Sequence, residues 1–314
     1  MKIRTLALAS LFAAHTIWAT TLAENFATDP AQAGWQIWGS AGLFQWNAAQ
    51  QNLAVTWDSA QPNSYFYHPL GTVLTTNDAF SLAFDLQLTD AVASGFFELA
   101  VGFLNFQNAT NAAFARGTGT DSPNLAEFNF FPDTGWGATL SATDTDNNST
   151  FNFFEDFTGL ANGVTYRIVL QHAAGAATVS AQVFNGSELY STLPVAFLST
   201  NFTDFRLDTV AVSSYTATND PWGDALLAHG TVANLVVTLP PPPVQNFSGQ
   251  FRAGQWQAQF MSRTNWIYAL ERSVDLLQWT VVAADIHGTD NFVFATDPVP
   301  PVAQVFYRVR AERP

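Results

Sequence analysis

Four oxygen-bearing side chains stand close together in the stretch Asp144–Glu155, at a spacing that suits a calcium ion. Asp144, Asp146 and Asn148 occupy alternate positions, and Glu155 follows Asp144 by eleven residues. A calcium ion takes about six to eight oxygen ligands from carboxylates, amides and the backbone. The spacing therefore raises the hypothesis of a calcium loop with these four residues as ligands.

The same stretch departs from a calcium-binding helix–loop–helix motif. Ser149 stands where the sharp turn of such a loop needs glycine, and the flanking residues have no helical pattern. Turn clusters of Asp and Asn need no metal to explain them. The sequence therefore favours a hairpin tip followed by a strand over Phe151–Phe154, and calcium binding is the alternative.

A second polar stretch, Gly117–Asn124, predicts a long loop between two strands. Loops on a rigid β framework often carry binding residues. Arg116, Asp121 and Asn124 have side chains that can hydrogen-bond to sugar hydroxyls, and Phe130–Trp136 adds aromatic surface. The composition favours a flexible connection rich in turn formers, and a carbohydrate site formed by Arg116, Asp121 and Asn124 is the alternative that we carry forward.

Aromatic residues make up 14% of the chain, with ten tryptophans and seven tyrosines. The apolar C–H faces of sugar rings stack on such side chains. Trp136 and Trp222 are the leading candidates for a sugar platform, because Gly, Asp and Pro surround both. Four further candidates are Trp46, Trp57, Tyr65 and Tyr67. Three aromatic residues are assigned to packing: Phe26, Trp35 and Trp38.

Residues for common catalytic mechanisms are sparse. Retaining glycoside hydrolases need two carboxylates close together, often as Glu-x-Asp-x-x-Glu on one strand, and that string does not occur. Glu155 and Asp156 are adjacent, so a strand would point them to opposite faces. The histidines have no metal-ligand spacing, and cysteine and Gly-x-Ser-x-Gly are absent. The sequence favours a non-catalytic protein, and a hydrolase with an atypical carboxylate pair is an alternative.

The elements that must position these residues are strands. Apolar and polar residues alternate in short runs separated by turn formers, which is typical of half-buried strands. Many such strands close most easily as two packed sheets. The sequence therefore predicts an all-β fold with at most one helical turn, over Asn219–Ala228. The predicted strands are Leu53–Trp57, Phe80–Leu88, Phe96–Phe103, Tyr166–Leu170, Thr178–Phe184, Phe205–Val212 and Val232–Thr238.

Several of these runs carry a resemblance to a known family. Their order along the chain resembles a concanavalin A-like or laminin G-like jelly-roll module, the module of many lectins and glucanases. The runs are Phe26–Trp46, Phe80–Leu86, Gly163–Tyr166, Val179–Gly186, Leu207–Val212 and Gly230–Val237. The resemblance covers residues 24–239 and implies a large antiparallel jelly-roll sandwich that recognises carbohydrate.

Four consecutive prolines, Pro240–Pro243, follow this region and predict a stiff spacer. The charge balance changes at the same place. Residues 24–239 carry 19 acidic residues against three arginines, whereas residues 244–314 carry six of each. The sequence therefore predicts two modules on either side of the linker.

The C-terminal region carries its own resemblance. Tyr268–Trp279 and the ending Phe306–Arg310 resemble the small fibronectin- or immunoglobulin-like β module of secreted bacterial proteins. The resemblance implies a small β-sandwich over residues 244–314 that positions or attaches the protein. Its expected core residues are Trp256, Phe260, Trp266, Tyr268, Trp279, Phe292, Phe294 and Phe306.

Residues 1–23 read as a secretory signal peptide. Lys2 and Arg4 precede an apolar stretch, and Ala23 suits cleavage before Glu24, with cleavage after Ala19 as a second possibility. The alternative is an uncleaved anchor. We therefore expect an exported protein, located in the periplasm, at the cell surface or outside the cell.

The net charge of −14 argues against nucleic acid or an anionic membrane as partner, because both require a basic surface. The expected partner is a polysaccharide or glycan, and the C-terminal module could contact the cell surface. The sequence thus predicts a secreted, non-catalytic, lectin-like protein. The first alternative is a structural or adhesive surface protein.

Overall fold

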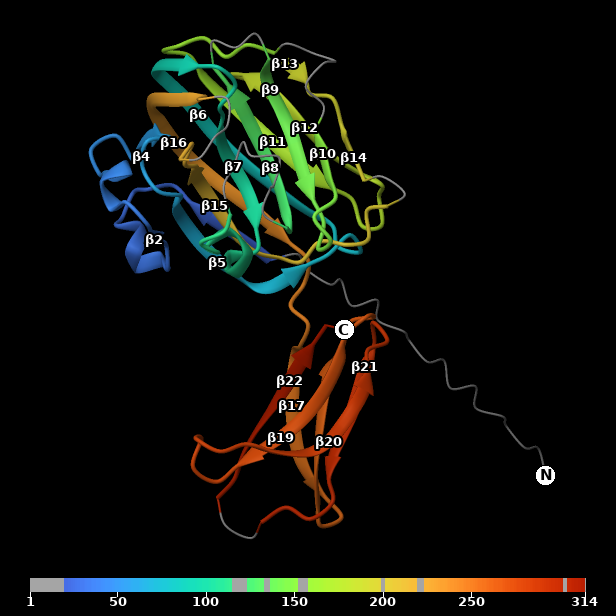
Figure 1. The fold of residues 1–314 in the computed structure, drawn as a ribbon. Helices are drawn as coiled ribbons and strands as arrows, with labels where there is room; N and C mark the ends of the chain where they lie inside the picture. Colours follow the sequence, from blue (N-terminus) through green and yellow to red (C-terminus); the bar gives the residue numbers. More distant parts are fainter. Residues whose placement is uncertain are drawn as a thin grey trace, which may run out of the picture.

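The structure is a computed structural model that describes residues 20–114, 123–132, 136–151, 158–198, 201–218, 223–301 and 304–313, with only the backbone of Thr150 and Phe151. It confirms the all-β prediction, because a large antiparallel jelly-roll sandwich is followed by a small β-sandwich (Figure 1). The helical elements in these residues are η1 (Pro30–Ala33), η2 (Ala41–Leu43) and α1 (Phe106–Ala109). In this part of the chain no helix is long and apolar enough to span a bilayer.

One sheet of the large sandwich has nine strands. They are β1 (Thr20–Glu24), β3 (Phe44–Asn47), β4 (Asn52–Asp58), β6 (Phe80–Ser94), β11 (Thr165–His172), β12 (Thr178–Asn185), β13 (Glu188–Thr192), β14 (Ala196–Phe197) and β16 (Ala225–Leu239). The main order is β13-β12-β11-β6-β16-β4-β3, while β1 pairs with β16 and β14 with β12. The long strands β6 and β16 therefore form the centre of this sheet.

The other sheet has seven strands. They are β2 (Gln36–Trp38), β5 (Ser64–Leu74), β7 (Leu99–Leu104), β8 (Leu125–Phe131), β9 (Gly137–Thr143), β10 (Ser149–Phe151) and β15 (Leu207–Ser214). Their order is β10-β9-β8-β7-β15-β5-β2. The predicted strands Phe96–Phe103 and Phe205–Val212 are confirmed as β7 and β15, which begin three and two residues later than expected.

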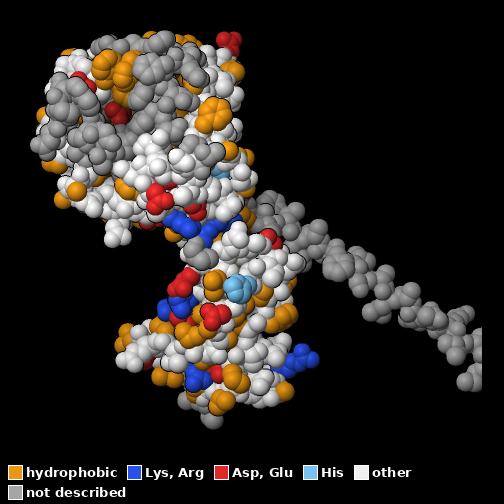
Figure 2. Space-filling view, turned by 45° about the vertical axis from the view of Figure 1, so that its right-hand side comes forward, with side chains coloured by type: hydrophobic (Ala, Val, Ile, Leu, Met, Phe, Trp, Pro, Cys, Tyr) orange, Lys and Arg blue, Asp and Glu red, His pale blue; other side chains and the backbone are white. Residues whose placement is uncertain are grey.

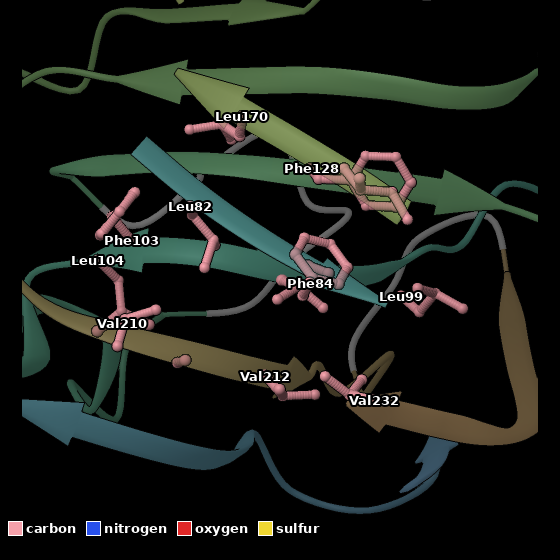
Figure 3. Close-up of a cluster of buried hydrophobic side chains, with 14 of the residues drawn as sticks. Leu82, Phe84, Leu99, Phe103, Leu104, Phe128, Leu170, Val210, Val212 and Val232 are labelled. Atoms are coloured by element: carbon pink, nitrogen blue, oxygen red, sulfur yellow. The ribbon is translucent and has the colours of Figure 1, made fainter. Parts of the chain in front are cut away.

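The apolar faces of the two sheets meet in one core. Leu82 and Phe84 of β6 are buried and alternate with half-buried positions, and the Phe84 ring lies near Phe128 of β8 (Figure 3). The rings of Phe84 and Phe128 meet edge to face, with centroids 5.8 Å apart. Burying one such side chain contributes about 1.5–3 kcal/mol, so the alternation seen in the sequence is what holds the two sheets together.

The small sandwich consists of two three-stranded sheets. The first contains β17 (Gln245–Arg252), β18 (Gln255–Met261) and β21 (Phe292–Asp297), and the second contains β20 (Thr280–His287), β19 (Ile267–Ser273) and β22 (Phe306–Glu312), each in the order given. Phe260, Trp266 and Tyr268 are buried between them, as predicted.

Phe294 was predicted to belong to this core, and that prediction is wrong. Its side chain is 67% exposed. The register of β18 with β21 pairs Phe294 with Gln259 and pairs Val293 with the buried Phe260. Successive side chains of a strand point to opposite faces, so Phe294 takes the outward face.

Charged residues connect the two sandwiches. Asp78, in the turn between β5 and β6, is buried and accepts hydrogen bonds from Arg263, at 2.8 Å, and from Arg313. Burial alone would raise the pKa of Asp78, but the hydrogen bonds and charges of the two arginines outweigh it and hold the pKa below its usual value. Figure 2 shows basic and acidic side chains gathered at the junction between the two sandwiches.

Strand β1 overlaps the end of the predicted signal peptide. Thr20–Glu24 pairs with Leu235–Leu239 of β16, so cleavage before Glu24 would remove most of this strand, whereas cleavage after Ala19 would leave it whole. Residues 1–19 lie outside the described residues, and the signal peptide stays a prediction. The predicted helical turn over Asn219–Ala228 is wrong for Ala225–Ala228, which begin β16, and residues 219–222 lie outside the described part.

Candidate functional site

The seven-stranded sheet has a second face, turned away from the core, on which polar side chains gather. Strands β7, β8 and β9 are buried at every position, so both of their faces are covered. Strand pairing places the residues of this face in rows across the sheet. One row is Gln36, Tyr67, Ala211, Gly102, Glu127 and Ser141, and the next is Trp38, Tyr65, Ser213, Ala100, Asn129 and Thr139. We call this surface the polar face.

Small residues form the middle of both rows. A Cβ atom on Gly102 would lie 2.5 Å from the carbonyl oxygen of Ala126 and 2.8 Å from Cγ of Glu127. Real side chains do not approach so closely, so glycine is required for the approach of β7 to β8. It also leaves room for the side chain of Glu127 to lie over the strand.

Glu127 is the buried carboxylate at the centre of the polar face. Its exposed fraction is 0%, and its Oε1 accepts a hydrogen bond from the Tyr215 hydroxyl at 2.6 Å and a longer one from Ser213 at 3.5 Å. Tyr215 follows β15 on the same side of the sheet. The two hydrogen bonds hold the Glu127 carboxyl group at a defined position on the polar face.

Asn129 lies beside Glu127 on the same strand, two residues further along. Its amide nitrogen donates to Ser141 Oγ at 2.8 Å, and both residues are fully buried. Carboxylate, amide and hydroxyl groups therefore lie next to one another on neighbouring strands. These are the kinds of donor and acceptor that bind sugar hydroxyl groups, and all three side chains are fully buried in the structure.

Aromatic side chains flank this polar centre. On the β2 and β5 side, Trp38 stacks on Tyr65 with ring centroids 5.6 Å apart, and Tyr65 contacts Tyr215 at 6.1 Å. At the turn between β8 and β9, Trp136 stacks on Phe96 at 4.0 Å. The predicted candidates Trp136, Tyr65 and Tyr67 thus lie on or beside the polar face, whereas Trp57 is a core residue.

Sequence reasoning missed the central role of Glu127 and Asn129. Neither Glu127 nor Tyr215 was among the predicted site residues. A signal was present, because the alternation in Leu125–Phe131 sets Glu127 and Asn129 on one face and Phe128 on the other. The pairing with Tyr215 had no local signal, since the two residues are 88 positions apart.

The residues predicted to bind carbohydrate are only partly described. Arg116, Asp121 and Trp222 lie outside the described residues. Asn124 is buried at the start of β8, where its Oδ1 accepts from the backbone N–H of Arg206 at 2.7 Å and its Nδ2 donates to Asn108 at 2.9 Å. These contacts tie three segments together, and the glycan contact of Asn124 stays a prediction.

The predicted calcium ligands form a hydrogen-bonded turn. Asp144 is fully buried, and its carboxylate accepts from the backbone N–H groups of Asp146, Asn148 and Thr203 at 2.8–2.9 Å and from the Asn148 amide. Burial alone would raise the pKa of Asp144, but these hydrogen bonds hold it below its usual value. Glu155 lies outside the described residues, so the calcium loop stays a prediction.

Carboxylates on the polar face do not form a close pair in the described residues. Glu98 precedes β7, and the register of β7 with β8 sets it four residues along the strand from Glu127. At about 3.4 Å per residue this is roughly 13 Å. A hydrolase needs about 5–9.5 Å between its two carboxyl groups. In the part of the chain that the structure describes, no group of three or more His, Asp or Glu residues could hold a metal.

Comparison with known proteins gives structural matches and no family. No protein-family model matches the sequence, and neither does any curated protein. Structural matches include the PL-14 alginate lyase from Aplysia kurodai, with a TM-score of 0.41 and 14% identity over 72% of this chain and 100% of that chain. The endo-1,3-beta-glucanase from Streptomyces sioyaensis gives 0.39 and 14% over 74% and 100%.

A third match is the endo-beta-1,4-glucuronan lyase from the fungus Trichoderma reesei, with a TM-score of 0.38 and 10% identity over 65% of this chain and 87% of that chain. At such low identity these likenesses concern the fold alone. The function proposed below therefore rests on the side chains of the polar face.

Proposed function

We propose that the polar face binds carbohydrate. The observation that carries the proposal is the row that sets Glu127 and Ser141 beside the small residues Gly102 and Ala211, with Tyr67 at its other side. Sugars combine hydroxyl groups, which need donors and acceptors, with apolar C–H faces, which stack on aromatic rings. The polar face offers both within two neighbouring rows.

Binding without catalysis is the favoured form of this proposal. The backbone positions of Glu98 and Glu127 lie roughly 13 Å apart along the strand direction, which does not favour them as the acid and base of a glycoside hydrolase. A hydrolase with another carboxylate pair is the alternative, and product release from a bound glycan would reveal it. Export, predicted from residues 1–23, would bring the protein to extracellular polysaccharide.

A glycan array with the full mature chain tests the proposal. We expect selective binding, and we expect Glu127→Gln to weaken it about tenfold or more, because hydrogen bonds to a charged group contribute about 1.5–3 kcal/mol. The matched control is Asp85→Asn, which makes the same change on the outer face of the nine-stranded sheet and should leave binding unchanged. Circular dichroism checks that both variants are folded.

Two further outcomes of the array are informative. Binding that is lost with a chelator and restored by calcium would assign a metal to Asp144, Asp146, Asn148 and Glu155. An array that stays blank with and without calcium contradicts the proposal and supports a structural or adhesive protein. Retention of the chain on cells without sugar binding would then be the next measurement.

A further inference from the structure

A cavity of about 580 Å³ lies where the large and small sandwiches meet. Its walls come from three regions. They are the β2–β5–β15 side of the seven-stranded sheet, the linker at Pro243, and Trp266 and Ala311 of the small sandwich. This volume lies within the range of about 300–1,000 Å³ that is common for ligand sites, and such sites often form between domains. We call it the junction cavity.

Two buried polar atoms around this cavity have no hydrogen-bond partner. They are the indole nitrogen Nε1 of Trp266, in the small sandwich, and Oγ1 of Thr72, in β5 of the large one. Trp266 is 5% exposed. Buried polar groups are nearly always hydrogen-bonded, so two such atoms from different sandwiches around one cavity need an explanation. Both atoms have almost no accessible surface in the free protein, so a small movement of the lining would have to expose them, and the hydroxyl groups of a ligand would then supply partners to both.

Other residues of the lining fit the same chemistry. Tyr67 stacks on Phe106 with ring centroids 4.3 Å apart and donates its hydroxyl proton to Gln36 Oε1 at 3.0 Å. Asp208 also lines the cavity and accepts from the backbone N–H of Phe106 at 2.9 Å. Aromatic surface and fixed acceptors thus lie side by side, as a sugar ring requires.

The junction cavity borders the polar face, because Gln36 and Tyr67 belong to both. Tyr67 and Gln36 belong to the row that contains Glu127, and only Ala211 and Gly102 stand between Tyr67 and Glu127. Three strand spacings separate them, or about 14 Å. A ligand that reaches from Glu127 to Trp266 must therefore be an oligosaccharide rather than a single sugar.

The small sandwich is held so that Trp266 stays at this place. Arg313 lies with its guanidinium 5.4 Å from the centre of the Trp266 ring, donates to the carbonyl oxygen of Val73 at 3.0 Å, and pairs with Asp78. Val73 itself lines the junction cavity. The charged contacts between the two sandwiches thus position Trp266 of the small sandwich against the seven-stranded sheet.

We propose that the junction cavity is a second part of the carbohydrate site, to which the C-terminal sandwich contributes Trp266. The ligand is an extended glycan that lies on the polar face and ends in the cavity, where its hydroxyl groups bind the Trp266 indole and Thr72. This inference rests on the proposed function of the polar face.

The test uses the full mature chain and three probes: the hexasaccharides of a β-1,3-glucan, a β-1,4-glucan and a β-1,4-mannuronan. The indole N–H signals are followed by ¹H–¹⁵N spectroscopy, with Trp266→Phe to assign the signal of Trp266. We expect the probe that binds to shift this signal, and we expect Trp266→Phe to raise its Kd about 2- to 10-fold, as for one lost hydrogen bond.

Two variants complete the design. Trp57→Phe is the matched control, because Trp57 is also buried with an unpartnered Nε1 but belongs to the core. The Kd of this variant for the glycan probe should equal that of the wild type. Thr72→Val removes the hydroxyl group at nearly constant volume and should also raise Kd. It keeps the test decisive if Trp266→Phe is poorly folded.

The outcomes separate the two proposals. In one outcome, binding depends on Glu127, but the Trp266 signal does not shift and Kd is unchanged in Trp266→Phe and Thr72→Val. This outcome contradicts the proposal for the junction cavity and leaves the proposal for the polar face intact. The same result would mean that only water satisfies the two buried atoms. If no probe binds the wild type and the glycan array is also blank, both proposals fall.

Discussion

Strands β6 and β12 of the nine-stranded sheet alternate buried and half-buried positions, whereas β7, β8 and β9 of the seven-stranded sheet are buried throughout. The outward face of the first sheet carries solvated groups such as the ion pair of Arg167 with Asp85, at 3.0 Å. The outward face of the second carries the buried network around Glu127. The two sheets share one core and differ in their outward faces, which are solvated in the nine-stranded sheet and buried in the centre of the seven-stranded sheet.

The difference indicates where function lies. A solvated face needs no network, because water satisfies its polar groups. A buried carboxylate costs free energy unless it is paired and hydrogen-bonded, and buried networks are sensitive to any lost partner. The polar face therefore carries groups that the core alone does not require, and we expect substitutions there to have larger effects than on the nine-stranded sheet.

The largest expected effect is that of Gly102→Val on stability. The new side chain would clash with the backbone at Ala126 and with Glu127, so we expect the free energy of unfolding to fall by about 3 kcal/mol or more. The matched control is Ala83→Val in β6, a half-buried position on the outer face of the nine-stranded sheet, where the change should stay within about 0.5 kcal/mol. Urea denaturation measures both, and equal losses would remove the contrast between the two faces.

A smaller loss is expected for Asp78→Asn, in the turn that leads from one sheet to the other. The substitution leaves Arg263 and Arg313 without their shared carboxylate, and breaking a buried pair is destabilising. Because the arginines keep some contact with solvent, we expect a loss of about 2 kcal/mol at pH 7. Calorimetry of the full chain measures it, and a change below 0.5 kcal/mol, given as a rough limit, would contradict the role of this contact.

The pH dependence of the same variant sharpens the test. The folded-state pKa of Asp78 is lowered from 3.8, so its stabilising contribution is fully present above the unfolded-state pKa. It is lost as the pH falls through the folded-state pKa. The wild type should therefore lose more stability than Asp78→Asn between neutral pH and strongly acidic pH. Parallel curves for the two proteins would contradict the assignment.

The fold could be predicted from the sequence because it depends on alternation, which is local. The alternation of Leu82 and Phe84 already shows which face of the strand enters the core, and the order of the runs resembled a jelly-roll module. The polar face could not be predicted, because it depends on which strands become neighbours. Glu127 meets Tyr215 only through the pairing of β7 with both β8 and β15. Phe294 failed for the same reason, since its face depends on register.

An intermediate effect is expected for Trp136→Ala. Trp136 is half-buried on Phe96 beside the polar face, so its loss should cost about 1 kcal/mol of stability and weaken glycan binding several-fold, roughly the range of one aromatic contact. The matched control is Trp46→Ala, because Trp46 lies on β3 of the other sheet with 38% exposure. It should not affect binding. Titration of both variants with one glycan measures this, and equal effects would show that the two faces do not differ in binding.

The smallest expected effect is that of Arg167→Ala on the outer face of the nine-stranded sheet. Arg167 pairs with Asp85 at 3.0 Å and donates to the carbonyl oxygen of Asn234, but both charged side chains remain partly exposed. Exposed ion pairs contribute about 0–1 kcal/mol and weaken with salt, so the loss should stay below about 1 kcal/mol and shrink in high salt. Denaturation at low and high ionic strength measures it. A loss as large as that of Gly102→Val would mean that the outer face of the nine-stranded sheet is as constrained as the polar face, and the distinction between the two sheets would fail.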